Sequence, residues 1–400
     1  MPENSPICAI QSNLCIMLMI GLMSGTSADG VDAALVEWPS GPSALPFRLL
    51  AEIEVPHSER MRARIHRLAD GALPSGEVLS ELVGLDVALG EAFAEAARSV
   101  AAEASLSLSR IDGIASHGQT VAHHPELMGT LQIGSAAIIA ERTGRPVIAD
   151  FRARDLAMGG EGAPLAPFFH HAVFTDSVEG RGVLNLGGIS NLTWLPPRAD
   201  PDAVVAFDVG PANSLVDGVV ALLTGGREKM DRDGGLALSG AVDSSFLEGL
   251  LTDEYFDRSP PKSTGRERYG SEACRVILNR WNAEKGDQSG NDLIATLVAL
   301  TTEAVGRACR DWTPDAGAQM DRLLVGGGGA LNPAMMMGLR RALPGVAIEE
   351  FDLHGVPIGA AEAMAFSLLG RNALLGVPNH LPKCTGARRA AVLGTLVWGE

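Results

Sequence analysis

The chain has 400 residues, too many for one hydrophobic core of the usual size, so two domains are expected. Hydrophobic residues make up 46% of the sequence, which suits a globular protein, and no apolar run is long enough to cross a bilayer. The formal charge of −16 argues against nucleic acid and an anionic membrane as partners, because both require a clustered positive field. It does not exclude a phosphorylated small molecule, which backbone N–H groups and a divalent cation can hold.

The N-terminus and the cysteines suggest a cellular location. Residues 1–16 lack the basic stretch of a secretory signal and are predicted to be a flexible extension. The cysteines are odd in number, far apart and without a C-x-x-C pair, which favours a reducing cytoplasm and makes a zinc site improbable. They are Cys8, Cys15, Cys274, Cys309 and Cys384.

Two stretches of the chain share one pattern, in which an apolar strand, a turn of Gly, Ser or Asn and a second apolar strand follow each other. The first covers residues 16–38 and the second residues 182–196. Glycine supplies positive φ and Ser or Asn bonds the local backbone, so both patterns predict β-hairpins. One hairpin near the N-terminus and one at mid-chain predict two domains built on a common plan.

Helical and strand patterns alternate through the rest of the chain. The predicted helices are 80–104, 135–144 and 291–312, and the predicted strands are 111–120, 145–151 and 323–325. The strand at 111–120 is expected to end in a polar turn, "SHGQT". Asn332 is the expected N-cap of a further helix, with Pro333 at its first position. This alternation predicts an α/β fold with a mostly parallel sheet in each domain.

Glycine-rich turns are the main candidates for ligand contact, because the common nucleotide motifs are missing. The sequence has no G-x-x-x-x-G-K-[ST], and "GGGGAL" does not complete G-x-G-x-x-G. Glycine turns lie at 21–32, 185–191 and 326–332. Each is either an ordinary structural turn or a place where a phosphate or ribose can approach the backbone closely.

Asp208 is the strongest candidate for a chemical role. It follows a short apolar strand and precedes Gly-Pro, at the strand end where open α/β sheets bind ligands. The alternative is an Asx-turn carboxylate that bonds its own backbone. Arg152, in an Asp- and Arg-rich segment, belongs either to a surface ion-pair cluster or to a pocket wall that binds an anion.

Ten motifs, taken together, resemble the anhydro-N-acetylmuramic acid kinase family over roughly residues 17–397. In chain order they are "GLMSGTSADGVD", "SHGQT", "ADFRARD", "GGEGAPLAP", "NLGGISN", "FDVGPANSLVD", "DRDGG", "PKSTGRE", "GGGGALN" and "GVPIGAAEAMAF". The resemblance implies a two-domain actin-like α/β fold of the sugar kinase/Hsp70/actin superfamily, with a central cleft. Domain I would comprise residues 17–165 and about 365–400, and domain II residues 166–364.

The resemblance also implies a reaction. Such kinases hydrolyse the 1,6-anhydro ring of 1,6-anhydro-N-acetylmuramic acid and phosphorylate O6 with ATP and Mg²⁺, in peptidoglycan recycling and amino-sugar catabolism. A cytoplasmic homodimer is the family expectation. Two rival interpretations are a related kinase acting on a free hydroxyl or carboxylate, and a non-catalytic nucleotide-dependent binding module.

The site residues implied by the resemblance fall into four groups. Asp208 is the catalytic residue that activates water. The ATP-binding residues are Gly25, Thr26, Ser27, Ala28, Asp29, Gly30, Val31, Asp32, Gly187, Gly188, Gly326, Gly327 and Gly328. The substrate-binding residues are Thr120, Asp150, Arg152 and Glu362, and Asp29 holds the metal through water. The chain departs from the family pattern at Ser135-Ala136 and at Glu161.

Overall fold

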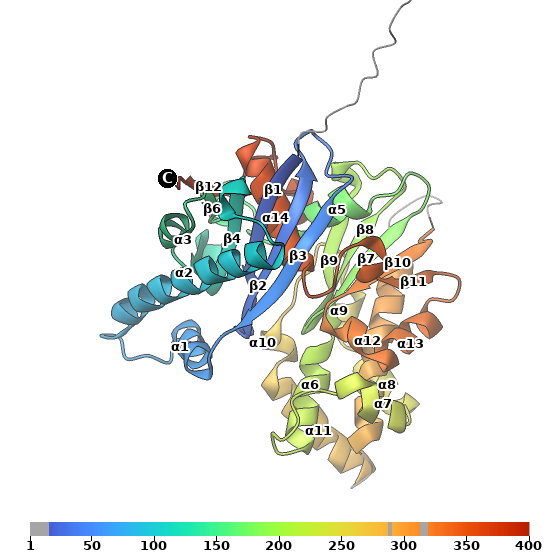
Figure 1. The fold of residues 1–400 in the computed structure, drawn as a ribbon. Helices are drawn as coiled ribbons and strands as arrows, with labels where there is room; N and C mark the ends of the chain where they lie inside the picture. Colours follow the sequence, from blue (N-terminus) through green and yellow to red (C-terminus); the bar gives the residue numbers. More distant parts are fainter. Residues whose placement is uncertain (1–15, 287–289, 313–318, 400) are drawn as a thin grey trace, which may run out of the picture.

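Two mixed sheets, each flanked by helices, make up the fold in the computed structural model (Figure 1). The structure describes residues 16–286, 290–312 and 319–399. The predicted extension therefore lies outside the described residues, apart from Ile16 at the start of the first strand. None of the helices in the described ranges has both the length and the apolar character to span a bilayer.

The first sheet has seven described strands in the order β12-β6-β4-β1-β2-β3, with β5 paired to β4. Its strands are β1 (Ile16–Ser24), β2 (Gly30–Pro39), β3 (Arg48–Pro56), β4 (Gly113–His124), β5 (Gly129–Ile133), β6 (Val147–Ala149) and β12 (Thr395–Val397). The second sheet has the order β11-β10-β7-β8-β9. Its strands are β7 (Arg181–Leu186), β8 (Ile189–Leu195), β9 (Val205–Pro211), β10 (Arg322–Gly326) and β11 (Ala347–Glu350).

Both predicted hairpins are confirmed, but the prediction of mostly parallel sheets is wrong. Strands β1 and β2 pair antiparallel, as do β7 and β8. Each hairpin is extended by a further antiparallel strand, β3 or β9. Parallel pairing is limited to β1-β4-β6 and β7-β10-β11. Short turns impose antiparallel pairing, whereas only the helical crossovers give parallel neighbours.

The polar turn expected within "SHGQT" is also wrong, because β4 continues through this motif to His124. Strand β5 pairs antiparallel with residues 119–124 and satisfies their backbone, which single-segment patterns do not reveal. The register shifts between Thr120 and Ala122, so the polar motif forms an irregular stretch of strand.

Helices cover the two faces of the first sheet. Helix α2 (Val78–Glu103) packs Leu85, Leu89 and Phe93 on the face formed by Ile20 and its neighbours. Helix α14 (Ala361–Leu374) covers the opposite face. The other helices that contact this sheet are α1 (Glu59–Ala69), α3 (Ala136–Thr143) and α4 (Ala153–Ala157). Helix α5 (Ala166–Phe174) lies against α14 and strands β7 and β8 of the second sheet, and α15 (Pro382–Thr385) lies against β9.

Helix α12 (Gly290–Asp311) is the central helix of the second sheet's half, where it packs against β9 and several helices (Figure 1). The predicted helix after Asn332 is confirmed as α13 (Pro333–Ala342), with the Asn332 side chain capping it. The remaining helices of this half are α6 (Asn213–Leu223), α7 (Gly235–Ser239), α8 (Ser244–Leu250), α9 (Glu254–Asp257), α10 (Arg266–Tyr269) and α11 (Ser271–Lys285). Single 3₁₀ turns are η1 (Leu108–Arg110), η2 (Pro125–Leu127), η3 (Pro201–Ala203), η4 (Arg232–Gly234), η5 (Gly328–Leu331) and η6 (Phe351–His354).

Helix α14 approaches β1 and β4 at glycines. A Cβ at Gly21 would overlap the Ala363 carbonyl oxygen and lie 2.7 Å from the Ser367 nitrogen. A Cβ at Gly370 would lie 2.5 Å from the Ala115 side chain. This close contact fixes the N-terminal turn of α14, which carries Glu362, relative to the first sheet.

We expect Gly21→Ala to destabilise the fold by about 1–3 kcal/mol, because the added methyl group must push α14 away from β1. A lower midpoint of urea unfolding would show the effect. Gly41→Ala is the matched control, since a Cβ there meets nothing within 4 Å and its φ is not in the left-handed region. Equal midpoints for the two variants would contradict this account of the helix contact.

Candidate functional site

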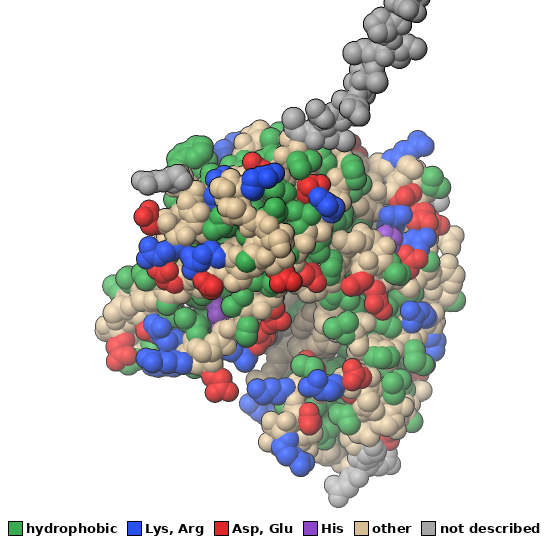
Figure 2. Space-filling view, viewed as in Figure 1, with side chains coloured by type: hydrophobic (Ala, Val, Ile, Leu, Met, Phe, Trp, Pro, Cys, Tyr) green, Lys and Arg blue, Asp and Glu red, His purple; other side chains and the backbone are tan. Residues whose placement is uncertain are grey.

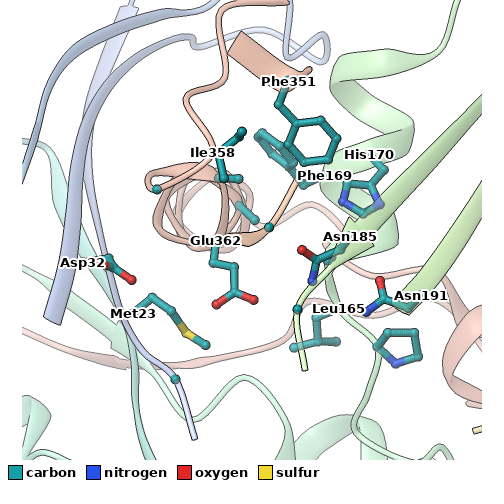
Figure 3. Close-up of a pocket in the computed structure, with 18 of the residues that line it drawn as sticks. Met23, Asp32, Leu165, Phe169, His170, Asn185, Asn191, Phe351, Ile358 and Glu362 are labelled. Carbon is teal, nitrogen blue, oxygen red and sulfur yellow. The ribbon is translucent and has the colours of Figure 1, made fainter. Parts of the chain in front are cut away.

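A cavity of about 870 Å³ lies between the two sheets. Figure 2 shows the molecule hollowed here, with acidic side chains along the rim. The wall comes from the β1–β2 turn, residues 163–170, the β7–β8 hairpin, Gly327–Gly328 and the start of α14. Figure 3 shows Glu362 and Asp32 pointing into the cavity, opposite Asn185 and Asn191.

The β1–β2 turn forms one wall of the cavity. The lining residues here are Gly25, Ser27, Asp29, Gly30 and Asp32. The Ala28 N–H donates to the Gly25 carbonyl at 3.0 Å and closes the turn. The Gln119 side chain donates to the same carbonyl at 3.1 Å, so "SHGQT" supports the turn from β4.

Three predicted nucleotide contacts in this turn do not line the cavity. They are Thr26, Ala28 and Val31, and the last two are fully buried beneath the turn. Helix α1 holds the turn from outside: Arg62 pairs with Asp29 at 2.7 Å, and the His66 ring contacts the Ser27 carbonyl at 3.1 Å. The carboxylate predicted to hold the metal is therefore already paired with a guanidinium.

The β7–β8 turn faces the first turn across the cavity. Gly187 lines the cavity, and Gly188 does not. Their carbonyls accept the first N–H groups of α6, at 3.1 Å from Asn213 to Gly187 and 3.0 Å from Ser214 to Gly188. The hairpin is thereby fixed on the start of a helix.

The third glycine turn needs glycine for two reasons. Gly327 has φ of 76°, and a Cβ there would overlap Asn185 and lie 2.8 Å from the Leu186 backbone. Gly327 and Gly328 line the cavity. Gly326 does not line it, because it lies beneath the Phe351 ring at the end of β10.

Asp208 lines the cavity from β9. Its carboxylate Oδ2 accepts the Thr264 N–H at 3.0 Å, and its carbonyl accepts the Tyr255 hydroxyl at 2.8 Å. Burial raises the pKa of Asp208 to about 6, although the Thr264 hydrogen bond opposes the shift. The expectation that a strand ends before Asp208 is wrong, because β9 continues through this residue to Pro211 and its later residues pair with β8. The carboxylate accepts from the backbone of a distant segment and does not bond a turn of its own.

Asn185 and Asn191 are site residues that sequence reasoning did not single out. Asn191 is the cross-strand partner of both Asn185 and Asp208. Directly opposed residues in antiparallel strands place their side chains on one face, so these three residues form a polar row along the cavity. The two asparagines at the ends of "NLGGISN" were the signal that could have identified them.

Arg152 is held in place by a neutral histidine. Its Nε and Nη2 donate to His117 Nε2 at 3.0 and 2.9 Å, and its Nη1 donates to the Gly162 carbonyl at 2.8 Å. Burial and the guanidinium lower the pKa of His117 to about 3, so this ring accepts from Arg152 and donates through Nδ1 to Gly118. Burial also lowers the pKa of Arg152 to about 10, which leaves the guanidinium charged at neutral pH.

Glu362 also reaches the cavity, from the first turn of α14. Its side chain is open to the cavity but surrounded by protein, which raises its pKa, while Arg152 opposes the shift. Thr120 and Asp150 do not line the cavity. The Thr120 hydroxyl accepts instead from Gln132 on β5 at 3.2 Å, and Asp150 is exposed in the turn after β6.

An acidic rim accompanies these residues. Burial and neighbouring carboxylates raise the pKa of Asp32 to about 7. Glu52 and Glu54 line the cavity from alternate positions of β3, and Glu350 and Asp352 line it from the other half. The alternation of "AEIEV" was a visible signal of a common face. Among the described residues no group of three or more His, Cys, Asp or Glu is arranged to hold a metal by itself.

Two halves built on hairpin-bearing sheets, with glycine turns and a carboxylate meeting in one cleft, are the arrangement of the actin-like α/β class. The profile of the family described as "Anhydro-N-acetylmuramic acid kinase" matches residues 17–399. The chain therefore belongs to the anhydro-N-acetylmuramic acid kinase family.

Individual relatives agree with this assignment. The chain is 39% identical to the anhydro-N-acetylmuramic acid kinase of Caldanaerobacter subterraneus, over 95% of this chain and 96% of the relative. It is 43% identical to the enzyme of the same name from Acidithiobacillus ferrooxidans, over 95% of this chain and 92% of the relative. Component A of (R)-2-hydroxyglutaryl-CoA dehydratase from Acidaminococcus fermentans is a solved structure with a TM-score of 0.44 and 12% identity, covering 89% of this chain and 99% of its own.

Proposed function

We propose that this chain uses ATP to open the 1,6-anhydro ring of 1,6-anhydro-N-acetylmuramic acid hydrolytically and to phosphorylate O6. The products are N-acetylmuramic acid 6-phosphate and ADP, in peptidoglycan recycling and amino-sugar catabolism. The observation that carries the proposal is one cavity in which Asp208 of the second sheet meets Arg152 and Glu362 of the first sheet's half. Family membership supplies the reaction, and the cavity supplies residues suited to it.

The nucleotide is proposed to bind where the glycine turns line the cavity. Gly25 and Gly187 bring two hairpin turns to the cavity wall, where backbone N–H groups can bind phosphate oxygens. Gly327 and Gly328 line the cavity with backbone and no side chain, at the place where adenosine is proposed to lie. Thr26, Ala28, Val31, Gly188 and Gly326 would act by shaping these turns.

Magnesium fits the donor set near the first turn. Asp29 and Asp32 both line the cavity, and carboxylate oxygens are ligands that this ion prefers. Mg²⁺ is usually held by one or two carboxylates together with phosphates and water, so a closed protein cage is not required. When bound, it would offset phosphate charge during transfer. For Asp29 to serve, its ion pair with Arg62 must open or be shared.

Asp208 is proposed to take a proton from the water that attacks C1 of the sugar. The water oxygen–C1 bond forms, the C1–O6 bond breaks, and O6 forms a bond to the γ-phosphorus as ADP leaves. Arg152 is proposed to bind the lactyl carboxylate, and Glu362 to position the sugar from the same side. Thr120 and Asp150 would act from behind the cavity wall.

A cytoplasmic homodimer remains a prediction.

The reaction predicts where oxygen from solvent ends up. In ¹⁸O-labelled water, mass spectrometry should find the label at the anomeric oxygen and the phosphate on O6. ADP should form with the anhydro sugar and not with N-acetylmuramic acid, whose O6 is already free. ADP formation with N-acetylmuramic acid instead would favour the related kinase that acts on a free hydroxyl.

The pKa of Asp208 predicts an acid limb in the rate profile. A base works when it is deprotonated, so kcat/KM should fall about tenfold per pH unit below pH 6. An ordinary aspartate with a pKa of 3.8 would place this fall in kcat/KM at a much lower pH.

Asp208→Asn should lose turnover at every pH, and calorimetry should show that it still binds ATP. Turnover within about tenfold of wild type would remove Asp208 from this role.

Arg152→Ala should raise KM for the anhydro sugar by roughly 10- to 100-fold, the loss expected for a charge-assisted hydrogen bond. The penalty should disappear with 1,6-anhydro-N-acetylglucosamine, which has no lactyl carboxylate. Arg154→Ala is the matched control, because that exposed side chain donates to the Val392 carbonyl and does not line the cavity. An equal rise in KM for both sugars would show that Arg152 does not bind the lactyl carboxylate.

A further inference from the structure

A buried lysine lies close to Asp208, and the reaction above gives it no task. Lys262, in the "PKSTGRE" motif, is 7% exposed. Its Nζ donates to the carbonyls of Tyr255 at 3.1 Å and Phe256 at 3.4 Å. The same ammonium lies 4.8 Å from the centroid of the Tyr255 ring and 5.9 Å from that of Phe207. These contacts fasten residues 261–264 to helix α9.

The fastened segment holds Asp208 at its backbone and its side chain. The Asp208 N–H donates to the Lys262 carbonyl at 3.1 Å. The Thr264 N–H donates to Asp208 Oδ2 at 3.0 Å. Tyr255, whose carbonyl binds the lysine, also donates its hydroxyl to the Asp208 carbonyl at 2.8 Å. Asp208 is therefore surrounded by a connected set of contacts, called here the circuit, which is formed by Lys262, Tyr255 and Thr264.

Burying an ammonium group is costly, so a lysine in this place needs compensation. Backbone carbonyls and aromatic faces are the groups that a buried cation accepts, and both are present. An apolar side chain of similar length could fill the volume, but it could not bond the two carbonyls. The charged end is what ties the segment to α9.

We propose that Lys262 and Tyr255 are positioning residues that hold the Asp208 carboxylate at the cavity wall for attack on the sugar. The inference rests on the proposed role of Asp208. It goes beyond that role because neither residue lines the cavity, and both act through the backbone of Asp208 and Thr264.

The circuit has a consequence that a purely structural role would not have. The Thr264 N–H bonds the ionised carboxylate and thereby lowers the pKa of Asp208. The charged or titratable groups facing Asp208 are Tyr255 from α9, and Lys262 and Glu267 from the segment that follows. Loosening this segment should weaken the Thr264 bond, so the acid limb of the rate profile should move to higher pH.

The test compares Lys262→Met with wild type. We expect kcat to fall about 10- to 100-fold, KM for both substrates to stay within about threefold, and the acid limb to move up by about 0.5–1 pH unit. Lys262→Arg keeps a cation and should recover part of kcat. Lys285→Met is the matched control, because Lys285 pairs with Asp243 away from the cavity, and its profile should not change.

Tyr255→Phe serves as a second variant in case Lys262→Met fails to fold, as judged by circular dichroism and thermal melting. It removes the hydroxyl bond to Asp208 and keeps the ring, so a smaller fall in kcat with the same direction of limb shift is expected. The inference would be overturned if folded variants kept the wild-type kcat and the wild-type pH of the acid-side fall in rate. It would also be overturned if the only change were a higher KM for the nucleotide. Failure of the wild-type enzyme to turn over the anhydro sugar would instead overturn the proposed function.

Discussion

The site depends on one constraint, which is that the Asp208 carboxylate is partly buried and so partly removed from water. Burial raises the pKa of Asp208 to about 6, which makes it a stronger base than an exposed aspartate while it stays mainly ionised at neutral pH. Within the described residues its carboxylate accepts a backbone N–H and forms no ion pair with a cation, which would lower the pKa and weaken the base. The register of β8 with β9 and the segment around Lys262 are both arranged to hold this one group.

Charge balance supports the proposed roles of backbone donors and a divalent cation in the cavity. The acidic rim surrounds a site proposed to bind a nucleotide and a sugar carboxylate, and Arg152 is the only arginine or lysine among its lining residues. Anionic ligands are therefore repelled unless they meet glycine N–H groups, a divalent ion or that guanidinium. The raised pKa of Asp32 is a sign of the same crowding of negative charge. A substrate carboxylate placed at Arg152 would form a charge-assisted hydrogen bond, which is stronger than the bond that a neutral sugar oxygen would form there.

The sequence predicted the parts of the fold that local chemistry determines. Both hairpins and helix α13 with its Asn332 cap follow from turn residues, capping and periodicity. The sheet order and the passage of β4 through "SHGQT" did not follow, because partners distant in sequence decide them. The same limit applied to the site. Motifs located Asp208 and Arg152, but the support from His117 and Lys262 depends on contacts across 35 and 54 or more residues that no local pattern encodes.

The apolar floor of the cavity is packed from both halves of the molecule. One hydrophobic cluster includes Val36 and Met364 of the first half, Val183 and Leu324 of the second sheet, and Phe351 between them. Phe169 and Phe351, which line the cavity, belong to this cluster, and Figure 3 shows them on one side of the cavity. A shared packed core resists separation, because each buried side chain would lose its contacts. We therefore expect any movement of the two halves to keep this cluster packed.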